Sequence, residues 1–200
     1  GAQFHNDGTR GGEITAKNPD GSPRHLYDAA FDLFSCKTPV VAAVQGAAVG
    51  GGLGVACFAD FRIAAPEARF TANFARLGFH HGFGLSVTLP GLVGQQKALE
   101  LLYTGARIKG EEAVEIGLAD KLVPLKDLRS ATFDFAGEIA ASAPLAVESI
   151  RETMRGHLPA AIKSATDREK EEQDRLRTTD DWKEGVSAMN ERRHPNFSRR

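Results

Sequence analysis

The chain has 200 residues, of which 42% are hydrophobic, with 25 basic and 26 acidic side chains. One sizeable core is expected at this length, and a net charge of −1 gives no indication of a nucleic-acid or membrane surface. Cys36 and Cys57 are too few for a disulfide framework and lack metal-ligand spacing. No apolar run reaches the roughly 18 residues of a membrane span. We therefore predict a globular cytoplasmic protein that binds no nucleic acid, membrane or metal.

The first half of the chain alternates between strand and helix patterns. Residues 39–44 (PVVAAV) form a short valine-rich run, typical of a buried strand. Residues 53–59 are apolar and can be helical, and residues 61–63 and 69–71 have strand patterns on either side of a proline turn. This order predicts layered α/β packing.

The second half is predicted to be mainly helical. Three short helices follow Gly84, each closed by a glycine at Gly94, Gly105 or Gly117. Residues 120–124 (DKLVP) can return as a strand, and nearly everything from Leu128 onward is helical. We place a core over residues 1–143 and a helical region over residues 144–200, which begins at Pro144. The charge-dense segment after residue 164 has few apolar residues for its length, which favours packing on another molecule such as a neighbouring subunit. A solvated helix face is the alternative.

Residues 46–54 (GAAVGGGLG) place five glycines between a strand and a helix. A helix start carries unpaired N–H groups and the positive end of the helix dipole, so it can bind an anion. The known phosphate loops do not fit, because no Lys-Ser or Lys-Thr follows and the GxGxxG register fails at Val55. An oxyanion-hole donor is one interpretation. Close packing of strand against helix is the other.

The wider stretch KTPVVAAVQGAAVGGGLGVACFADFRIAAPEARF resembles the crotonase, or enoyl-CoA hydratase/isomerase, superfamily. The shared features are the lysine and proline before an apolar strand, the triple glycine, the aspartate and the alanine-x-phenylalanine motif. The resemblance continues through LLYTGARIKGEEAVEIGLADKLVP and TTDDWKEGVSAMNERRHPNF, and so covers almost the whole sequence.

The resemblance implies an α/β fold, a spiral of β-β-α turns followed by a helical C-terminal region that forms trimers, often paired into hexamers. The family's first fifty or so residues have no counterpart here, so we expect the first strands of the spiral to be missing from this sequence. The implied substrate is an acyl-CoA thioester, with coenzyme A as part of the substrate and no separate cofactor.

The resemblance also implies which backbone groups hold an enolate-like anion. The middle glycine of the triplet, Gly51, supplies one N–H, and Gly50 beside it is expected to contact substrate. The second donor corresponds to Gly8 in FHNDG, where Asn6, Asp7 and Thr9 depart from the usual motif.

The family's carboxylates are absent from the matching positions. Hydratases place one glutamate two residues after the triple glycine, where this chain has Gly54. The second corresponds to Phe74, which we expect to contact substrate instead. A third acidic position, used by some isomerases and a dehalogenase branch, corresponds to Gly82. Standard water addition needs two opposed carboxylates, so the pattern argues against it.

The nearby loop ARLGFHHGFG offers His80 and His81, and His81 stands where the family often has proline. Histidine exchanges protons near neutral pH, so either is a candidate base. Capping or lining the pocket is the alternative role. Phe197, with Arg192 and Arg193, is a candidate contact for the adenine end of coenzyme A. The alternative is a solvated basic tail. His5 and the stretch containing His25 and Tyr27 are weaker candidates for the site.

Three functions remain open from the sequence. The first is an acyl-CoA enzyme that uses Gly8 and Gly51 for isomerisation or an unusual hydration. The second is a hydrolase of the same fold, in which His80 or His81 activates water against a thioester or a β-diketone. The third is an acyl-CoA binding protein without catalysis.

Overall fold

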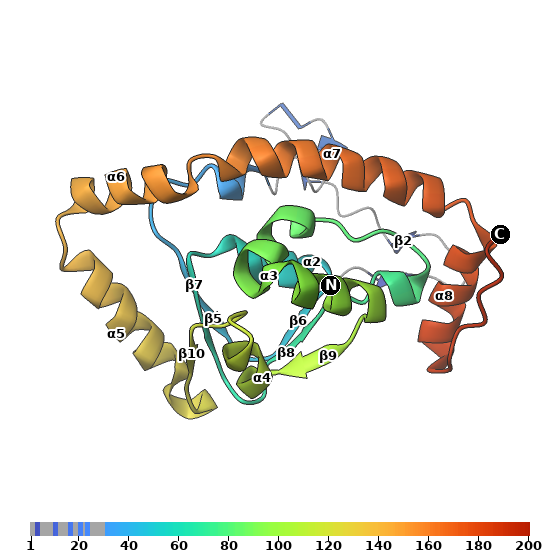
Figure 1. Ribbon diagram of the computed structural model, residues 1–200, viewed down its shortest axis with the longest axis horizontal. Coiled ribbons are helices and arrows are strands. Elements are labelled where there is room, and N and C mark those ends of the chain that lie inside the picture. Colours follow the sequence, from blue (N-terminus) through green and yellow to red (C-terminus); the bar gives the residue numbers. More distant parts are fainter. Residues whose placement is uncertain (1–2, 5–9, 12–15, 18–19, 22, 25–30) are drawn as a thin grey trace.

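The computed structural model describes residues 3–4, 10–11, 16–17, 20–21, 23–24 and 31–200 (Figure 1). Its strands are β1 (Gln3–Phe4), β2 (Arg10–Gly11), β3 (Ala16–Lys17), β4 (Pro23–Arg24), β5 (Val41–Val44), β6 (Ala47–Val49), β7 (Phe61–Ala64), β8 (Arg69–Thr71), β9 (Arg107–Lys109) and β10 (Lys121–Leu122). Its helices are α2 (Gly51–Phe58), η1 (Ala75–Leu77), α3 (Leu85–Thr104), α4 (Gly110–Glu115), η2 (Leu125–Asp127), α5 (Leu128–Ala140), α6 (Pro144–Arg155), α7 (Leu158–Leu176) and α8 (Asp180–Glu191).

Two three-stranded sheets form the centre of the molecule. In the first, β7 lies between β5 and β10, and all three strands are parallel. In the second, β8 pairs parallel with β6 and antiparallel with β9. Strands β1 to β4 form two further antiparallel pairs, β1 with β2 and β3 with β4.

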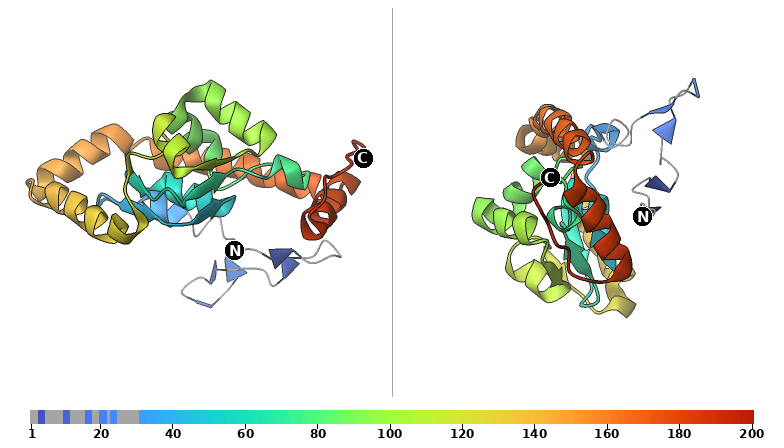
Figure 2. Two further views of the ribbon diagram at one scale, coloured as in Figure 1. Left: turned by 90° about the horizontal axis from the view of Figure 1, so that it is seen from below. Right: turned by 90° about the vertical axis from the view of Figure 1, so that its right-hand side faces the viewer.

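The main hydrophobic core lies between the sheets and the helices that follow the glycine-rich turn. Helix α2 packs on β6 and on α3, which covers the strands in both views of Figure 2. Leu53, Phe70 and Leu85 are almost completely buried in this core. Removing such side chains from water is the main source of stability, about 1.5 to 3 kcal/mol for each.

Most predicted elements are confirmed. The strand expected over residues 39–44 is β5, and α2, β7 and β8 follow in the predicted order. Two predicted helices are joined into α3, but the backbone breaks at Gly94 (φ 76°, ψ 160°), and the helix ends on the left-handed Gly105. Strands β6 and β9 were not predicted, because three-residue strands beside glycines have too little alternation to be recognised.

The C-terminal helices surround one side of this core. Figure 1 shows α5 and α6 at one end, α7 across the length of the molecule and α8 at the other end. The charge-dense helix α7 packs on α3 and buries Ile162, Glu169 and Gln173, while Trp182 of α8 lies in the main core. Part of this segment therefore packs on its own chain, and the expected packing on a neighbouring subunit stays a prediction.

Among the described helices, none combines the length and the apolar character needed to cross a lipid bilayer.

Candidate functional site

The glycine-rich turn joins the end of β6 to the start of α2. Gly50 has φ 54° and ψ −115°, a backbone conformation that residues other than glycine rarely adopt. Its N–H donates to the carbonyl of Thr71 on the neighbouring strand β8 (3.0 Å), and its own carbonyl accepts the first helical bond, from Gly54 N–H (3.1 Å). The turn is thus held on both sides, and Gly51 becomes the first residue of the helix.

The backbone N–H of Gly51 is the group best placed to bind an anion. Gly51 is exposed and stands at the positive end of α2, where a helix leaves its first N–H groups without intrahelical partners. Within the described part of the chain, no acceptor pairs with this N–H. A β-carbon at position 51 would lie 3.9 Å from Phe83, an ordinary contact, so the space beside Gly51 is open to a small group.

Phe83 fills the space beside Gly54, the position of the family's first glutamate. A β-carbon at position 54 would lie 2.6 Å from Cβ and 2.7 Å from Cγ of Phe83, which is too close for any side chain. Phe83 itself has a left-handed backbone (φ 64°) and packs with Phe34 and Ile162. Position 54 is a glycine, and the ring of Phe83 fills the space that a longer side chain there would need.

Phe74, at the position of the second glutamate, belongs to an aromatic cluster. Its ring would lie 3.5 Å from a β-carbon on Gly50, and it meets Phe79 edge-on at 5.5 Å between ring centroids. Phe79 in turn meets Trp182 of α8 at 4.5 Å. Aromatic rings thus stand at both carboxylate positions beside the turn, and Gly82 at the third is buried.

The two histidines lie in the loop before α3, with their rings stacked at 4.1 Å between centroids and 27° between planes. His80 Nδ1 lies 2.8 Å from the carbonyl oxygen of His81, and His81 Nε2 lies 2.8 Å from Ser86 Oγ. Burial lowers the pKa of His81 from its ordinary value of 6.5 to about 4, and the neighbouring His80 acts in the same direction. His81 is therefore neutral at physiological pH.

Glu169 is a buried carboxylate that the sequence analysis missed. Its side chain reaches from α7 to the start of α3, where Oε2 accepts from Gly84 N–H (2.8 Å) and Oε1 accepts from Ser86 N–H (3.0 Å) and Ser86 Oγ (2.7 Å). Burial raises the pKa of Glu169, while the hydrogen bonds from Ser86 and Gly84 oppose that rise. A signal was present, since Glu169 and Gln173 share helical spacing with the buried Ile162.

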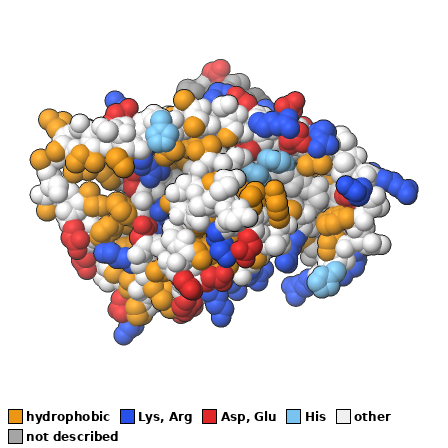
Figure 3. All heavy atoms as spheres, in the orientation of Figure 1, with side chains coloured by type: hydrophobic (Ala, Val, Ile, Leu, Met, Phe, Trp, Pro, Cys, Tyr) orange, Lys and Arg blue, Asp and Glu red, His pale blue; other side chains and the backbone are white. Residues whose placement is uncertain are grey.

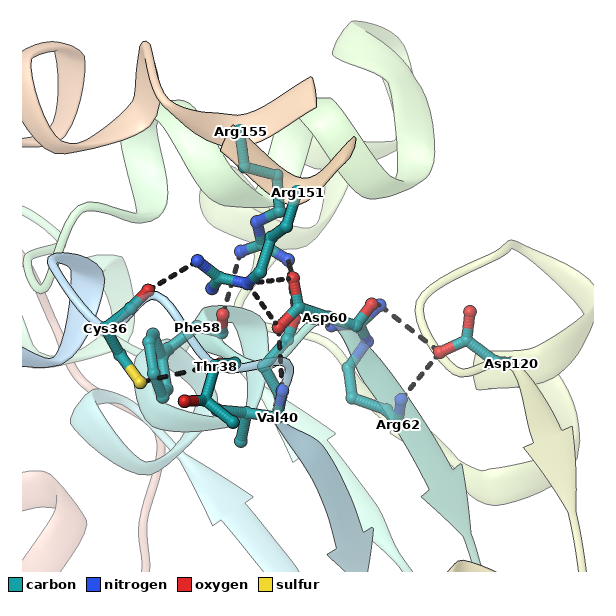
Figure 4. Close-up of polar contacts among 10 residues, drawn as sticks. Cys36, Thr38, Val40, Phe58, Asp60, Arg62, Asp120, Arg151 and Arg155 are labelled. Carbon is teal, nitrogen blue, oxygen red and sulfur yellow. Dashed lines mark hydrogen bonds and ion pairs between the residues drawn. The ribbon is translucent and has the colours of Figure 1, made fainter. Parts of the chain in front are cut away.

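A second polar cluster joins α6 to the strand that follows α2. Asp60 accepts from Val40 N–H (2.8 Å) and from Arg151 Nε (3.0 and 3.1 Å), and it lies 3.0 Å from Arg155 Nη1 (Figure 4). Asp60 stands in the turn between α2 and β7, and its side chain ties this turn to the backbone just before β5. It also anchors two arginines of the C-terminal region.

Arginines of this cluster cap the carboxyl end of α2. Arg155 donates to the carbonyls of Phe58 (2.8 Å) and Ala59 (3.2 Å), and the buried Arg62 donates to Ala59 (2.7 Å). Carbonyls at a helix end lack intrahelical donors and carry partial negative charge, so cations stabilise them. The helix that presents Gly51 at one end is therefore held by guanidinium groups at the other.

The remaining predicted residues that the structure describes lie in the tail after α8. Phe197 is 41% exposed and lies in the tail after α8, where Ser198 N–H donates to Asp181 (2.6 Å). Arg193 pairs with Glu184 and Glu191 of α8. Gly8, the predicted second donor, lies outside the described residues, as do His5, His25 and Tyr27.

Comparison with known proteins assigns this chain to a family. The family model described as enoyl-CoA hydratase/isomerase matches residues 7–200. The chain therefore belongs to the enoyl-CoA hydratase/isomerase family, as the sequence resemblance predicted.

Individual relatives agree with this assignment. The chain is 36% identical over 155 residues to a short-chain-enoyl-CoA hydratase of Clostridium acetobutylicum, a match that covers 78% of this chain and 59% of the relative. It is 39% identical over 159 residues to a crotonyl-CoA hydratase of Syntrophomonas wolfei, covering 80% of this chain and 61% of the relative. The matched part thus spans about three fifths of these curated relatives.

The structural comparison confirms the crotonase-like α/β fold. A crystal structure of an enoyl-CoA hydratase/isomerase from Pseudoalteromonas atlantica T6c superposes with a TM-score of 0.82 and 29% identity. This match covers 90% of this chain and 73% of the other.

Proposed function

We propose that this protein acts on an acyl-CoA thioester and stabilises the thioester enolate with the backbone N–H of Gly51. The observation that carries the proposal is this N–H, which is exposed at the positive end of α2 and has no acceptor within the described residues. Gly8 remains the proposed second donor, from its place in the sequence motif. Coenzyme A enters as part of the substrate.

Within this proposal, isomerisation is a better chemical fit than water addition. Hydration needs one group to activate water and another to deliver a proton, whereas positions 54 and 74 present a glycine covered by Phe83 and a phenylalanine. Double-bond migration needs only one base that takes a proton from one carbon and returns it to another. In a 3-enoyl thioester, the base removes the Cα proton, the enolate oxygen accepts from Gly51 N–H, and the proton returns to Cγ.

We assign the base role to His81. It is neutral at physiological pH, so a ring nitrogen is free to accept a proton, and it lies two residues from Phe83, which lines the turn. The same neutral imidazole also supports the hydrolase alternative, in which it takes a proton from water that attacks the thioester carbonyl and coenzyme A leaves as the thiol.

The test is a mass-spectrometric screen of the purified protein against 2-enoyl, 3-enoyl, 3-keto and aromatic CoA thioesters, with chromatographic separation of isomers. We expect a 3-enoyl substrate to change retention time at unchanged mass. Release of free coenzyme A would replace the isomerase with the hydrolase. A gain of water would show that hydration proceeds without the two carboxylates, and tight binding without conversion would leave a binding protein.

His81→Ala separates the three functions further. In an enzyme that uses His81 as its base, turnover should fall by a factor on the order of 10² to 10⁴, while CoA affinity changes little. Unchanged turnover would remove His81 from the mechanism. In a protein that only binds acyl-CoA, the substitution should leave the CoA affinity almost unchanged.

A further inference from the structure

The hydrogen bonds around Ser86 determine where the proton of His81 sits. A serine hydroxyl has a single hydrogen, and the contact of Ser86 Oγ with Glu169 Oε1 (2.7 Å) uses it when Glu169 is ionised. The contact between Ser86 Oγ and His81 Nε2 (2.8 Å) then requires the nitrogen to be the donor. The chain of donors runs from His81 Nε2 to Ser86 and from Ser86 to Glu169.

The ionised form of Glu169 follows from its position. The carboxylate accepts three hydrogen bonds, two of them from backbone N–H groups at the amino end of α3, where the helix dipole favours negative charge. Its side chain is 1% exposed, so these donors replace water. A carboxylate held in this way accepts and does not donate.

We propose that Glu169, acting through Ser86, holds His81 in the tautomer with the proton on Nε2 and the lone pair on Nδ1. Glu169 and Ser86 are then positioning residues, and Nδ1 is the atom that accepts the substrate proton. The tautomer stands on the geometry alone, whereas the role of Nδ1 rests on the proposed function.

His80 is held in the opposite tautomer. Its Nδ1 faces the carbonyl oxygen of His81, which can only accept, so this nitrogen carries the proton. Gln173 Nε2 also donates to the carbonyl of His80 (2.9 Å). Residues four apart on α7 therefore hold both histidines, Glu169 through Ser86 and Gln173 through the loop backbone.

The charge around His81 is consistent with a positioning role. Glu169 faces it from α7, at 3.9 Å from Oε1 to Nε2, and His80 stacks on its ring from the loop. Ser86 stands between His81 and the carboxylate. The carboxylate thus acts on the imidazole through the Ser86 hydroxyl, because the direct distance of 3.9 Å is too long for a hydrogen bond.

The tautomers can be read from two-bond ¹H–¹⁵N correlation spectra of histidine-labelled protein at pH 7, without any substrate. We expect Nε2–H for His81 and Nδ1–H for His80. In Ser86→Ala, which keeps both backbone donors to Glu169, His81 should populate both tautomers. A wild-type His81 with its proton on Nδ1, or spectra unchanged by Ser86→Ala, would overturn the inference.

Kinetics with the substrate found in the screen test the consequence. Ser86→Ala should lower kcat about tenfold or more and change KM less than twofold, and Ser86→Thr, which restores the hydroxyl, should recover most of the activity. Ser130→Ala removes a hydroxyl on α5 that donates only to Asp127 among the described residues, and serves as the control with no effect. Full kcat in Ser86→Ala would overturn the positioning role, even if His81→Ala is inactive. Full activity in His81→Ala would instead reject His81 as the base. The assignment of the tautomers would then be tested by the NMR spectra alone.

Discussion

Phe83 and Gly54 form a steric pair, because the phenyl ring occupies the space that any side chain at position 54 would need. Gly54→Ala should therefore lower the free energy of unfolding by about 1 to 3 kcal/mol, the usual range for overpacking a core. Gly52→Ala is the matched control on the same helix. A β-carbon there meets nothing within 4 Å, so alanine should be neutral or stabilising by up to about 1 kcal/mol. Urea unfolding measures both.

A double-mutant cycle tests whether Phe83 is the cause. Phe83→Ala alone should destabilise by about 3 to 5 kcal/mol, since a buried ring is lost. In that background the clash with the phenyl ring is removed and only the β-carbon of residue 83, 2.6 Å away, remains, so Gly54→Ala should cost less than it does in wild type. Additive losses would show that Phe83 is not what excludes a side chain at position 54.

His81 should make stability depend on pH in a defined direction. Because burial lowers its pKa from 6.5 to about 4, the unfolded chain binds a proton in this interval that the folded protein does not. Lowering the pH from 7 to 4 should therefore cost wild type about 3 kcal/mol more than His81→Gln. Burial raises the pKa of Glu169, which acts in the opposite direction, but both proteins share that effect. Unfolding curves with equal pH dependence would contradict the burial of a neutral His81.

At the scale of the element, α2 is held from its carboxyl end by α6. Arg155→Gln removes donors to the carbonyls of Phe58 and Ala59 and one partner of Asp60, so it should destabilise by about 1 to 3 kcal/mol. Lys163→Gln breaks an exposed pair with Asp167 on α7 and should cost less than about 0.5 kcal/mol. Thermal unfolding of the two variants compares them, and equal losses would exclude a capping role for Arg155.

The elements that could be predicted from sequence are those with a clear pattern of their own. The valine-rich β5 and the glycine-rich start of α2 follow from local chemistry. Strands β6 and β9 depend on pairing with β8, which a window of sequence does not contain. Glu169 was missed for a similar reason, because a glutamate among many charges looks exposed until the amino end of α3 is placed against it.

The candidate site shows the same division. The glycine triplet predicted the turn between strand and helix at which Gly51 exposes its N–H, whereas the assignment of carboxylate positions to Gly54 and Phe74 rests on the sequence motif. The replacement of one carboxylate by the ring of Phe83 could not be predicted, because it depends on a left-handed backbone at a non-glycine residue.

At the scale of the whole molecule, the end formed by α5 and α6 is notably apolar. Figure 3 shows hydrophobic side chains gathered there, and the most exposed are Phe133, Leu145, Ile150 and Met154, at 63 to 81%. We expect the protein to self-associate through this end, in line with the trimers that the sequence resemblance implies.

Sedimentation velocity over a range of concentrations tests this expectation. Ile150→Glu should shift the protein toward the monomer, whereas Met189→Glu, at an exposed site on α8 at the opposite end, should leave the assembly unchanged. A wild-type protein that stays monomeric, or equal effects of the two variants, would argue against this surface.

The proposed role of the Gly51 N–H in stabilising the enolate can be tested by replacing Gly51. Proline is well tolerated at the first position of a helix, so Gly51→Pro removes the N–H and keeps α2. Gly51→Ala keeps the N–H, and its β-carbon makes only an ordinary contact with Phe83.

The measurement is kcat for both variants on the thioester identified by the screen, with melting temperatures to confirm folding. The account predicts that Gly51→Pro loses a factor on the order of 10² to 10³ while Gly51→Ala stays within about tenfold of wild type. Comparable activity in the two folded variants would contradict it.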